Sequence, residues 1–172
     1  MTVFRFLGIP TDVATAVRTT GHAPGYGHPV HRDTATGYGP CRHCLRTFAV
    51  GHEDRLLFTY QPFTAPGSLP APGPVFVHAA ECTRYDASEV PADFRSIPLV
   101  VEAYGNEGQL LRQLRVGARG IEEVLEDVLA TPGTEYGHIR NGEAGCFMAR
   151  VESSDSGCLT PGQARPLASS RA

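Results

Sequence analysis

The stretch that decides the fold is IPLVVEAYGNEGQLLRQLRVGARGIEEVLEDVLA, residues 97–130. Its first half has two strand-like runs, 97–104 and 109–116, on either side of a Gly-Asn-Glu-Gly turn, and this arrangement predicts a β-hairpin. Its second half predicts an amphipathic helix over 121–130, because apolar side chains recur there at helical spacing: Ile121, Val124, Leu125, Val128 and Leu129. A hairpin followed directly by a helix indicates a mixed α+β fold.

Further elements follow on both sides of this stretch. A helix is expected from Pro10 to the stop at Gly21, and short strands are expected over 3–7, 55–61, 75–78, 136–140 and 146–151. Residues 20–40 contain many Gly, Pro and His residues and predict a loop, with a short strand near Val30. We therefore expect an α+β fold with an antiparallel sheet of about five or six strands, two helices and a small Cys/His-rich loop region.

The chain of 172 residues has the length of one domain. We expect a single α+β domain over residues 1–152. From residue 153 the sequence is rich in Ser, Gly, Pro and Ala, which predicts a disordered C-terminal tail over 153–172 that includes Cys158.

The charged residues exclude several classes of protein. All 15 basic residues are arginine, so a pyridoxal Schiff base, a Walker phosphate loop and a protein kinase, which each need a lysine, are ruled out. The net charge is −3 and the sequence pI is about 6.1, which argues against nucleic acid and membrane surfaces as partners. We find no secretion signal or membrane span and expect a cytoplasmic protein with reduced thiols.

The cysteines and one histidine form a pattern typical of metal sites. Cys41 and Cys44 are separated by two residues, and His78 and Cys82 by three, so the chain reads Cys-x2-Cys-x33-His-x3-Cys. Zinc takes four such ligands in a tetrahedron, and we predict a zinc site at these four residues. Three alternatives stay open: Cys146 takes the fourth position in place of His78, the cysteines are core residues, or Cys41 and Cys44 are a redox pair.

Three residues are candidates for catalysis. His43 lies inside the Cys-x2-Cys turn, Cys146 begins a predicted strand, and Tyr60 ends another. Each has an ordinary structural role as its simplest interpretation. Arg42, Arg46 and Arg84 lie near the Cys/His residues in the sequence and are the residue type that binds anions in a bidentate fashion.

Three functions are compatible with these residues. The first is a binding or accessory module with a structural zinc site. The second is a metal-dependent enzyme of a small-molecule or secondary-metabolite pathway, with an open metal position near the Cys/His cluster. The third is a thiol redox protein that uses the first two cysteines. A small molecule or a protein is the expected partner, and a homodimer would form through an exposed strand edge.

Four blocks of sequence carry a family resemblance. CRHCLR at 41–46, LLFTYQPF at 56–63, GPVFVHA at 73–79 and GCF at 145–147 together resemble the bacterial domain-of-unknown-function family 1203. The resemblance extends over nearly the whole chain to about residue 151. It implies a compact single domain and supplies no activity.

Overall fold

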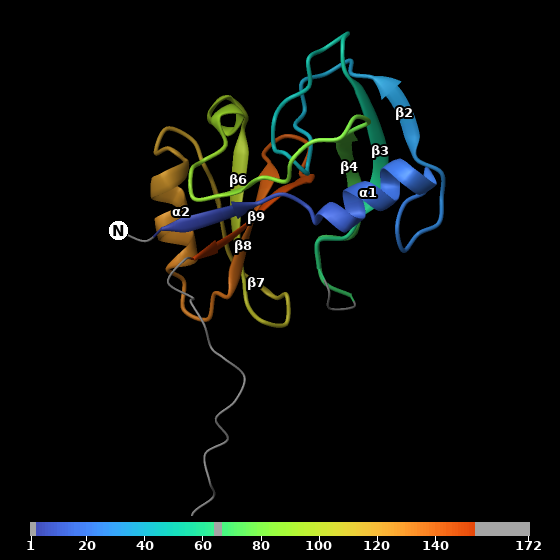
Figure 1. Cartoon of the computed structure of the whole chain (residues 1–172). Coiled ribbons are helices and arrows are strands. Elements are labelled where there is room, and N and C mark those ends of the chain that lie inside the picture. The colour runs from blue at the N-terminus through green and yellow to red at the C-terminus, as the bar shows by residue number, and fades with distance from the viewer. Residues whose placement is uncertain (1–2, 64–66, 154–172) are drawn as a thin grey trace, which may run out of the picture.

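The computed structural model describes residues 3–63 and 67–153 and contains two antiparallel sheets (Figure 1). The larger sheet has six strands in the order β5-β1-β9-β8-β6-β7. Its strands are β1 (Phe4–Leu7), β5 (Asp86–Ala87), β6 (Leu99–Tyr104), β7 (Leu110–Arg115), β8 (Tyr136–Asn141) and β9 (Phe147–Ser153). The predicted α+β class, with a sheet of five or six strands and two helices, is confirmed.

The predicted hairpin and helix are the centre of this larger half. β6 and β7 pair in antiparallel register, and β6 is buried along its whole length between β7 and β8. Helix α2 (Ile121–Leu129) packs on β6 and β7, and its buried residues are the ones that the helical spacing predicts: Ile121, Val124, Leu125 and Val128. A large apolar core with Val101, Ile139, Met148 and Val151 results.

The smaller sheet consists of β2 (His31–Thr34), β3 (Asp54–Tyr60) and β4 (Gly73–His78). The strands expected near residue 30, over 55–61 and over 75–78 are therefore present, but they form a sheet of their own. Each pairs with its neighbour in the sequence, so their backbone groups find partners without joining the main sheet. Helix α1 (Thr11–Thr20) lies beside β3 (Figure 1) and packs into a second apolar core.

Two short elements and the C-terminal end of the described chain complete the fold. The sequence did not predict the two-residue strand β5 or the short 3-10 helix Ala92–Ser96. Ser153 is the last residue of β9, and the remainder of the expected tail, with Cys158, lies outside the described residues. Over 3–63 and 67–153, no helix has both the length and the apolar character needed to cross a membrane.

Candidate metal centre

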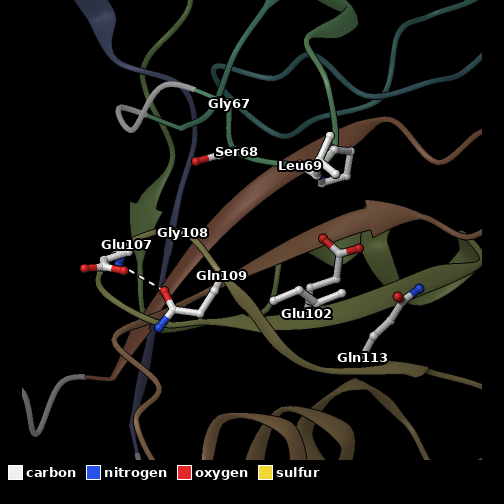
Figure 2. A pocket seen from close by; sticks show the side chains of 10 residues that line it. Gly67, Ser68, Leu69, Glu102, Glu107, Gly108, Gln109 and Gln113 are labelled. Carbon is white, nitrogen blue, oxygen red and sulfur yellow. Dashed lines mark hydrogen bonds between the residues drawn. The ribbon is translucent and has the colours of Figure 1, made fainter.

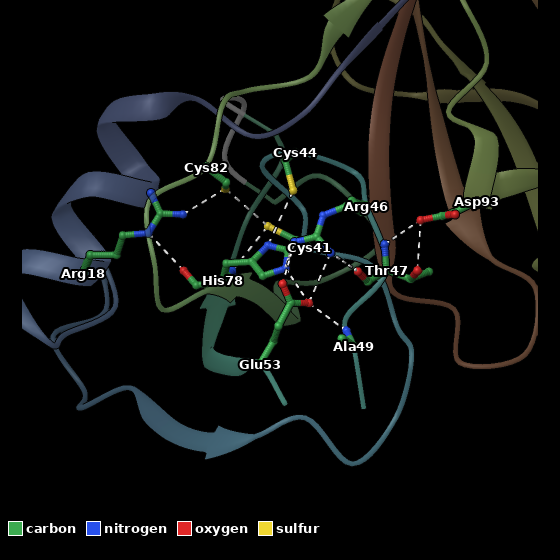
Figure 3. A network of polar contacts seen from close by, with 10 residues as sticks. All are labelled: Arg18, Cys41, Cys44, Arg46, Thr47, Ala49, Glu53, His78, Cys82 and Asp93. Carbon is green, nitrogen blue, oxygen red and sulfur yellow. Dashed lines mark hydrogen bonds and ion pairs between the residues drawn. The ribbon is translucent and has the colours of Figure 1, made fainter. Parts of the chain in front are cut away.

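The four residues of the Cys-x2-Cys and His-x3-Cys pairs come together in space, where the turn at 41–44 meets the end of β4 (Figure 3). One ligand atom from each of Cys41, Cys44, His78 and Cys82 lies within 4.8 Å of the others. Cys41 is fully buried and His78 is 3% exposed, while the other two are partly exposed. The structure thus groups His78 with the three cysteines, and Cys146 lies elsewhere.

The local backbone explains how the first two thiols face the same side. The N–H of Leu45 donates to the carbonyl of Cys41 at 2.8 Å, and the N–H of Cys41 donates to the carbonyl of Arg46 at 2.9 Å. This closes a tight turn, in which Leu45 has a φ of 59°, a left-handed conformation that leucine rarely adopts. Leu45 packs into the core of the larger sheet and Cys41 into that of the smaller one. The turn therefore connects the two cores.

Neighbouring backbone also fixes this turn from outside. The N–H of Ile9 donates to the carbonyl of Arg42, and the N–H of Tyr85 donates to the carbonyl of His43, each at 2.8 Å. A Cβ atom on Gly8 would lie 2.0 Å from the His43 carbonyl oxygen. Only glycine therefore permits the chain between β1 and α1 to approach the turn this closely.

The distances within the cluster suit a tetrahedral zinc ion. Cys41 Sγ lies 3.9 Å from Cys82 Sγ, and Cys44 Sγ lies 3.5 Å from His78 Nδ1. With Zn–S bonds of about 2.3 Å and Zn–N bonds of about 2.0 Å, a tetrahedron has S–S edges of about 3.8 Å and S–N edges of about 3.5 Å. Three thiols and one imidazole are also the donor atoms that zinc prefers.

His78 is held from its far side by a carboxylate. Its Nε2 lies 3.4 Å from Glu53 Oε2, while its Nδ1 faces the thiols. Arg46 Nη2 donates to Glu53 Oε1 at 2.6 Å and also lies 3.0 Å from His78 Nε2. The hydrogen bond from Arg46 and that from the Ala49 backbone lower the pKa of Glu53 to about 2, so it is ionised. A carboxylate on the second ring nitrogen is the usual way in which proteins orient a metal-bound histidine.

The thiols share protons unequally when no metal is bound. Hydrogen bonds from the Cys44 and Cys82 thiols lower the pKa of Cys41, and the pKa of Cys44 is raised because it donates. Burial lowers the pKa of His78, but its contacts with Cys41 and Cys82 outweigh this and raise it to about 9. The cluster therefore concentrates negative charge on the buried Cys41 sulfur, where a cation would bind.

Two further donors stabilise charge on the sulfurs. Arg18, from the last turn of α1, donates to Cys82 Sγ at 3.1 Å and to the His78 carbonyl at 3.0 Å. The backbone N–H of His78 donates to Cys41 Sγ at 3.4 Å. Neither Arg18 nor Glu53 was predicted from the sequence, because neither belongs to a motif and only the folded chain brings them to the cluster.

The three candidate catalytic residues occupy three different places. His43 lies at the edge of the cluster, with Nδ1 3.2 Å from Cys82 Sγ and Nε2 3.1 Å from Thr11 Oγ1, and burial lowers its pKa. Tyr60 ends β3 and contacts Phe147, with ring centroids 5.7 Å apart, and burial raises its pKa.

Cys146 lies in a pocket between the two sheets, where Arg42 Nη2 donates to its Sγ at 3.0 Å. This pocket has a volume of about 420 Å³, and in the described part of the chain none of the four clustered residues lines it. The other two arginines near the cluster are engaged with the protein itself: Arg46 pairs with Glu53, and Arg84 donates to the carbonyl of Gly8.

A second pocket opens on the β6–β7 side of the larger sheet (Figure 2), with a volume of about 710 Å³. Glu102 and Gln113 lie opposite each other there on paired strands. Glu102 Oε2 accepts hydrogen bonds from the Tyr104 hydroxyl and from Arg140 Nε, both at 2.6 Å. Arg140 lines the inter-sheet pocket, so this ion pair separates the two pockets.

Comparison with known proteins gives a family and no relative of known function. A family model described as "Protein of unknown function (DUF1203)" matches residues 38–153. The match contains the four clustered residues and Cys146, whereas β1 and α1 precede it. Neither the curated proteins nor the solved structures provide a match.

Proposed function

The chain belongs to the DUF1203 family, and we propose that it is a small zinc-binding accessory module whose metal has a structural role. The observation that carries this proposal is the group of Cys41, Cys44, His78 and Cys82, whose ligand atoms lie within 4.8 Å of one another. Four protein ligands complete the tetrahedron that structural zinc sites use, whereas catalytic sites keep one position for water or substrate.

The surroundings of the cluster also favour a structural role. Cys41 and His78 are buried, and the turn that carries Cys41 contributes Leu45 to the core of the other sheet. A metal bound here would hold that turn to the end of β4 and so stabilise the smaller sheet. Zinc would stabilise the smaller sheet through its bonds to the four ligands alone, because it has no redox chemistry.

The proposal also includes a cellular compartment and a class of partner. Zinc-binding cysteines must stay reduced, which fits the cytosol. A protein or a small molecule is the proposed partner of such a module, and a homodimer would use a free edge of one of the sheets. A metal-dependent enzyme and a thiol redox protein are the competing functions, and the experiment below separates them.

The test is the metal content of the reduced protein, purified without chelators or added metal. We expect about one zinc ion per chain, and we expect cobalt exchanged into the site to give the strong visible absorption of a tetrahedral thiolate complex. Cys41→Ser should lose the metal, while the matched control Cys146→Ser should retain it. A protein without metal would overturn the proposal. If the metal-free protein also forms a reversible disulfide between Cys41 and Cys44, the redox function replaces the proposed structural one. Water bound to the metal in place of one of the four ligands would favour the enzyme.

A further inference from the structure

The pocket between the two sheets brings together three blocks of sequence that lie far apart in the chain. Arg42 comes from the Cys-x2-Cys turn, Val75 and Phe76 from β4, and Cys146 and Phe147 from the start of β9. The walls are largely apolar, and the volume of about 420 Å³ is in the range of small-molecule sites. The pocket is distinct from the metal cluster, whose ligands do not line it in the described residues.

Arg42 brings a positive charge to this pocket without a carboxylate to balance it. Its side chain donates to the carbonyls of Pro40 and Phe147 and to Cys146 Sγ, and the residue is 3% exposed. A guanidinium stays charged in proteins, and a buried charge is costly unless an opposite charge lies nearby. Among the described residues, the acceptors of Arg42 are these carbonyls and one thiol.

Arg140 enters the pocket from β8 with one nitrogen unsatisfied. Its Nε donates to Glu102 and its Nη1 to the carbonyl of Gly145 at 3.3 Å. Its Nη2 is buried and has no hydrogen-bond partner in the described part of the chain, and the residue is only 6% exposed. Leaving a buried donor unpaired costs about 1–3 kcal/mol in proteins, and more for a charged group. A bound acceptor would remove this cost.

The balance of charge indicates what the pocket binds. Glu102 offsets the charge of Arg140, and Arg18, which donates to Cys82, faces the negative charge of the metal cluster. One positive charge, that of Arg42, is left over. We propose that this pocket binds a small molecule with one carboxylate and an apolar body, with the carboxylate at Arg42 and Arg140 and the body against Val75, Phe76 and Phe147.

Cys146 allows the proposal to be tested in the wild-type, metal-loaded protein. Iodoacetate is a small carboxylate that alkylates thiols, with formation of an S–C bond, loss of iodide and release of the thiol proton to solvent; iodoacetamide is its neutral counterpart. Cleavage after arginine places each of the five cysteines in a separate peptide, and Cys146 falls in 141–150. Mass spectrometry of these peptides over time therefore gives the rate at Cys146 alone.

We expect the iodoacetate-to-iodoacetamide rate ratio at Cys146 to exceed that of N-acetylcysteine at least tenfold. Arg140→Gln should reduce this excess severalfold, while Arg95→Gln, which removes an exposed arginine outside the pocket and joins two peptides without cysteine, should leave it unchanged. A ratio equal to that of N-acetylcysteine would overturn the proposal, as would equal effects of the two substitutions.

A second measurement needs no variant and stands even if Arg140→Gln fails to fold. 3-Phenylpropionate should slow the alkylation of Cys146 by iodoacetamide at millimolar concentration, and 3-phenylpropionamide should do so at least tenfold less effectively. Equal protection by the acid and the amide, or none by either, would contradict a carboxylate site. Unlabelled peptides of Cys41 and Cys44 confirm that the metal cluster stays intact, so this result is independent of the proposed metal function.

Discussion

The two sheets of this protein are stabilised in different ways. In the larger half, β6 is buried at all six positions and α2 contributes four buried apolar residues, so its core is continuous. In the smaller half, β2 has three exposed residues out of four, and the core reaches the thiol cluster, where Cys41 is one of its buried members. Where apolar burial is modest, a metal would supply the stability that packing does not.

The Cys-x2-Cys turn is the point at which these two kinds of stability meet. Leu45 belongs to the larger core, while Cys41 belongs to the smaller core and to the metal cluster. We therefore expect removal of the metal to destabilise mainly the smaller half. Substitutions in the larger core should lower the stability of both halves.

The largest expected effect comes from removing the metal. Structural zinc binding is worth about 10–16 kcal/mol in zinc-finger peptides, and the core of the smaller half, which this metal would supplement, has fewer buried residues than that of the larger half. After chelation, we expect amide hydrogen exchange in β3 and β4 to accelerate at least 100-fold, while amides of β6 and β8 change much less. Uniform acceleration in both sheets would show that the two halves are not distinct, and unchanged exchange would show that the cluster does not stabilise the smaller sheet.

The converse experiment uses Leu125, which is fully buried in the larger core. Leu125→Ala should lower the free energy of unfolding by about 2–5 kcal/mol, because it removes apolar contacts and leaves a cavity. Metal content should stay at the wild-type value, since Leu125 lies outside the cluster. Urea unfolding followed by far-UV circular dichroism, with metal analysis of the same sample, gives both quantities. Loss of metal in this variant would mean that the larger core positions the ligands.

The comparison also explains which parts of the structure the sequence could predict. The β6–β7 hairpin and α2 follow from local signals, namely a Gly-Asn-Glu-Gly turn and helical spacing of apolar residues. The separate small sheet was not predicted, because partner choice among short strands depends on the turns that connect them in space. Its strand β2, mostly exposed, lies in a stretch that the Gly and Pro content marks as a loop.

For the candidate metal centre, spacing predicted which four residues come together but not their environment. Cys41, Cys44, His78 and Cys82 are recognisable as two pairs in the sequence. Glu53 and Arg18 approach them only through folding, from the residue just before β3 and from the last turn of α1. The inter-sheet pocket was equally hidden, because nothing local connects Arg42 with Cys146, 104 residues away.

The buried His138 allows the apolar character of the larger half to be tested by changing the pH. It lies on β8, fully buried between aromatic rings that include Phe63, Tyr104 and Phe147, with both ring nitrogens unpaired among the described residues. Burial lowers its pKa to about 2. Below pH 6.5 His138 is protonated in the unfolded chain but stays neutral in the folded protein. The free energy of unfolding therefore decreases as the pH falls. Between pH 6.5 and 4.5 we expect a loss of about 2–3 kcal/mol from this residue.

The matched variant is His138→Phe, which keeps an aromatic ring and removes the titration. Its stability advantage over the wild type should grow by that amount between pH 6.5 and 4.5, as measured by urea unfolding at each pH. Metal loss at acid pH affects both proteins and cancels in the difference. A constant difference across this range would mean that His138 gains a proton without unfolding, and hence that the larger core admits water there.

The smallest expected effect comes from Glu53, which contacts one of the four clustered residues, His78. Glu53→Gln keeps the shape of the side chain and removes the charge that faces His78 Nε2 at 3.4 Å. Outer partners of metal-bound histidines contribute about 10–100-fold in affinity, and we expect the lower end because the amide oxygen can still accept a hydrogen bond. Competition with a chromophoric chelator measures the affinity, and the control is Asp54→Asn, which changes a partly exposed carboxylate at the start of β3 that pairs with Arg32 of β2.

The Glu53 result also decides how far the metal side of the comparison extends. Glu53 accepts hydrogen bonds from Arg46 and from the Ala49 backbone as well, so it could hold the loop before β3 without influencing the metal. If that is its only role, Glu53→Gln lowers the stability of the metal-free protein and leaves zinc affinity at the Asp54→Asn value. If it orients His78, affinity falls about tenfold while the metal-free protein is little changed. The second outcome would extend the proposed metal site, as a functional unit, from its four ligands to the loop residue just before β3.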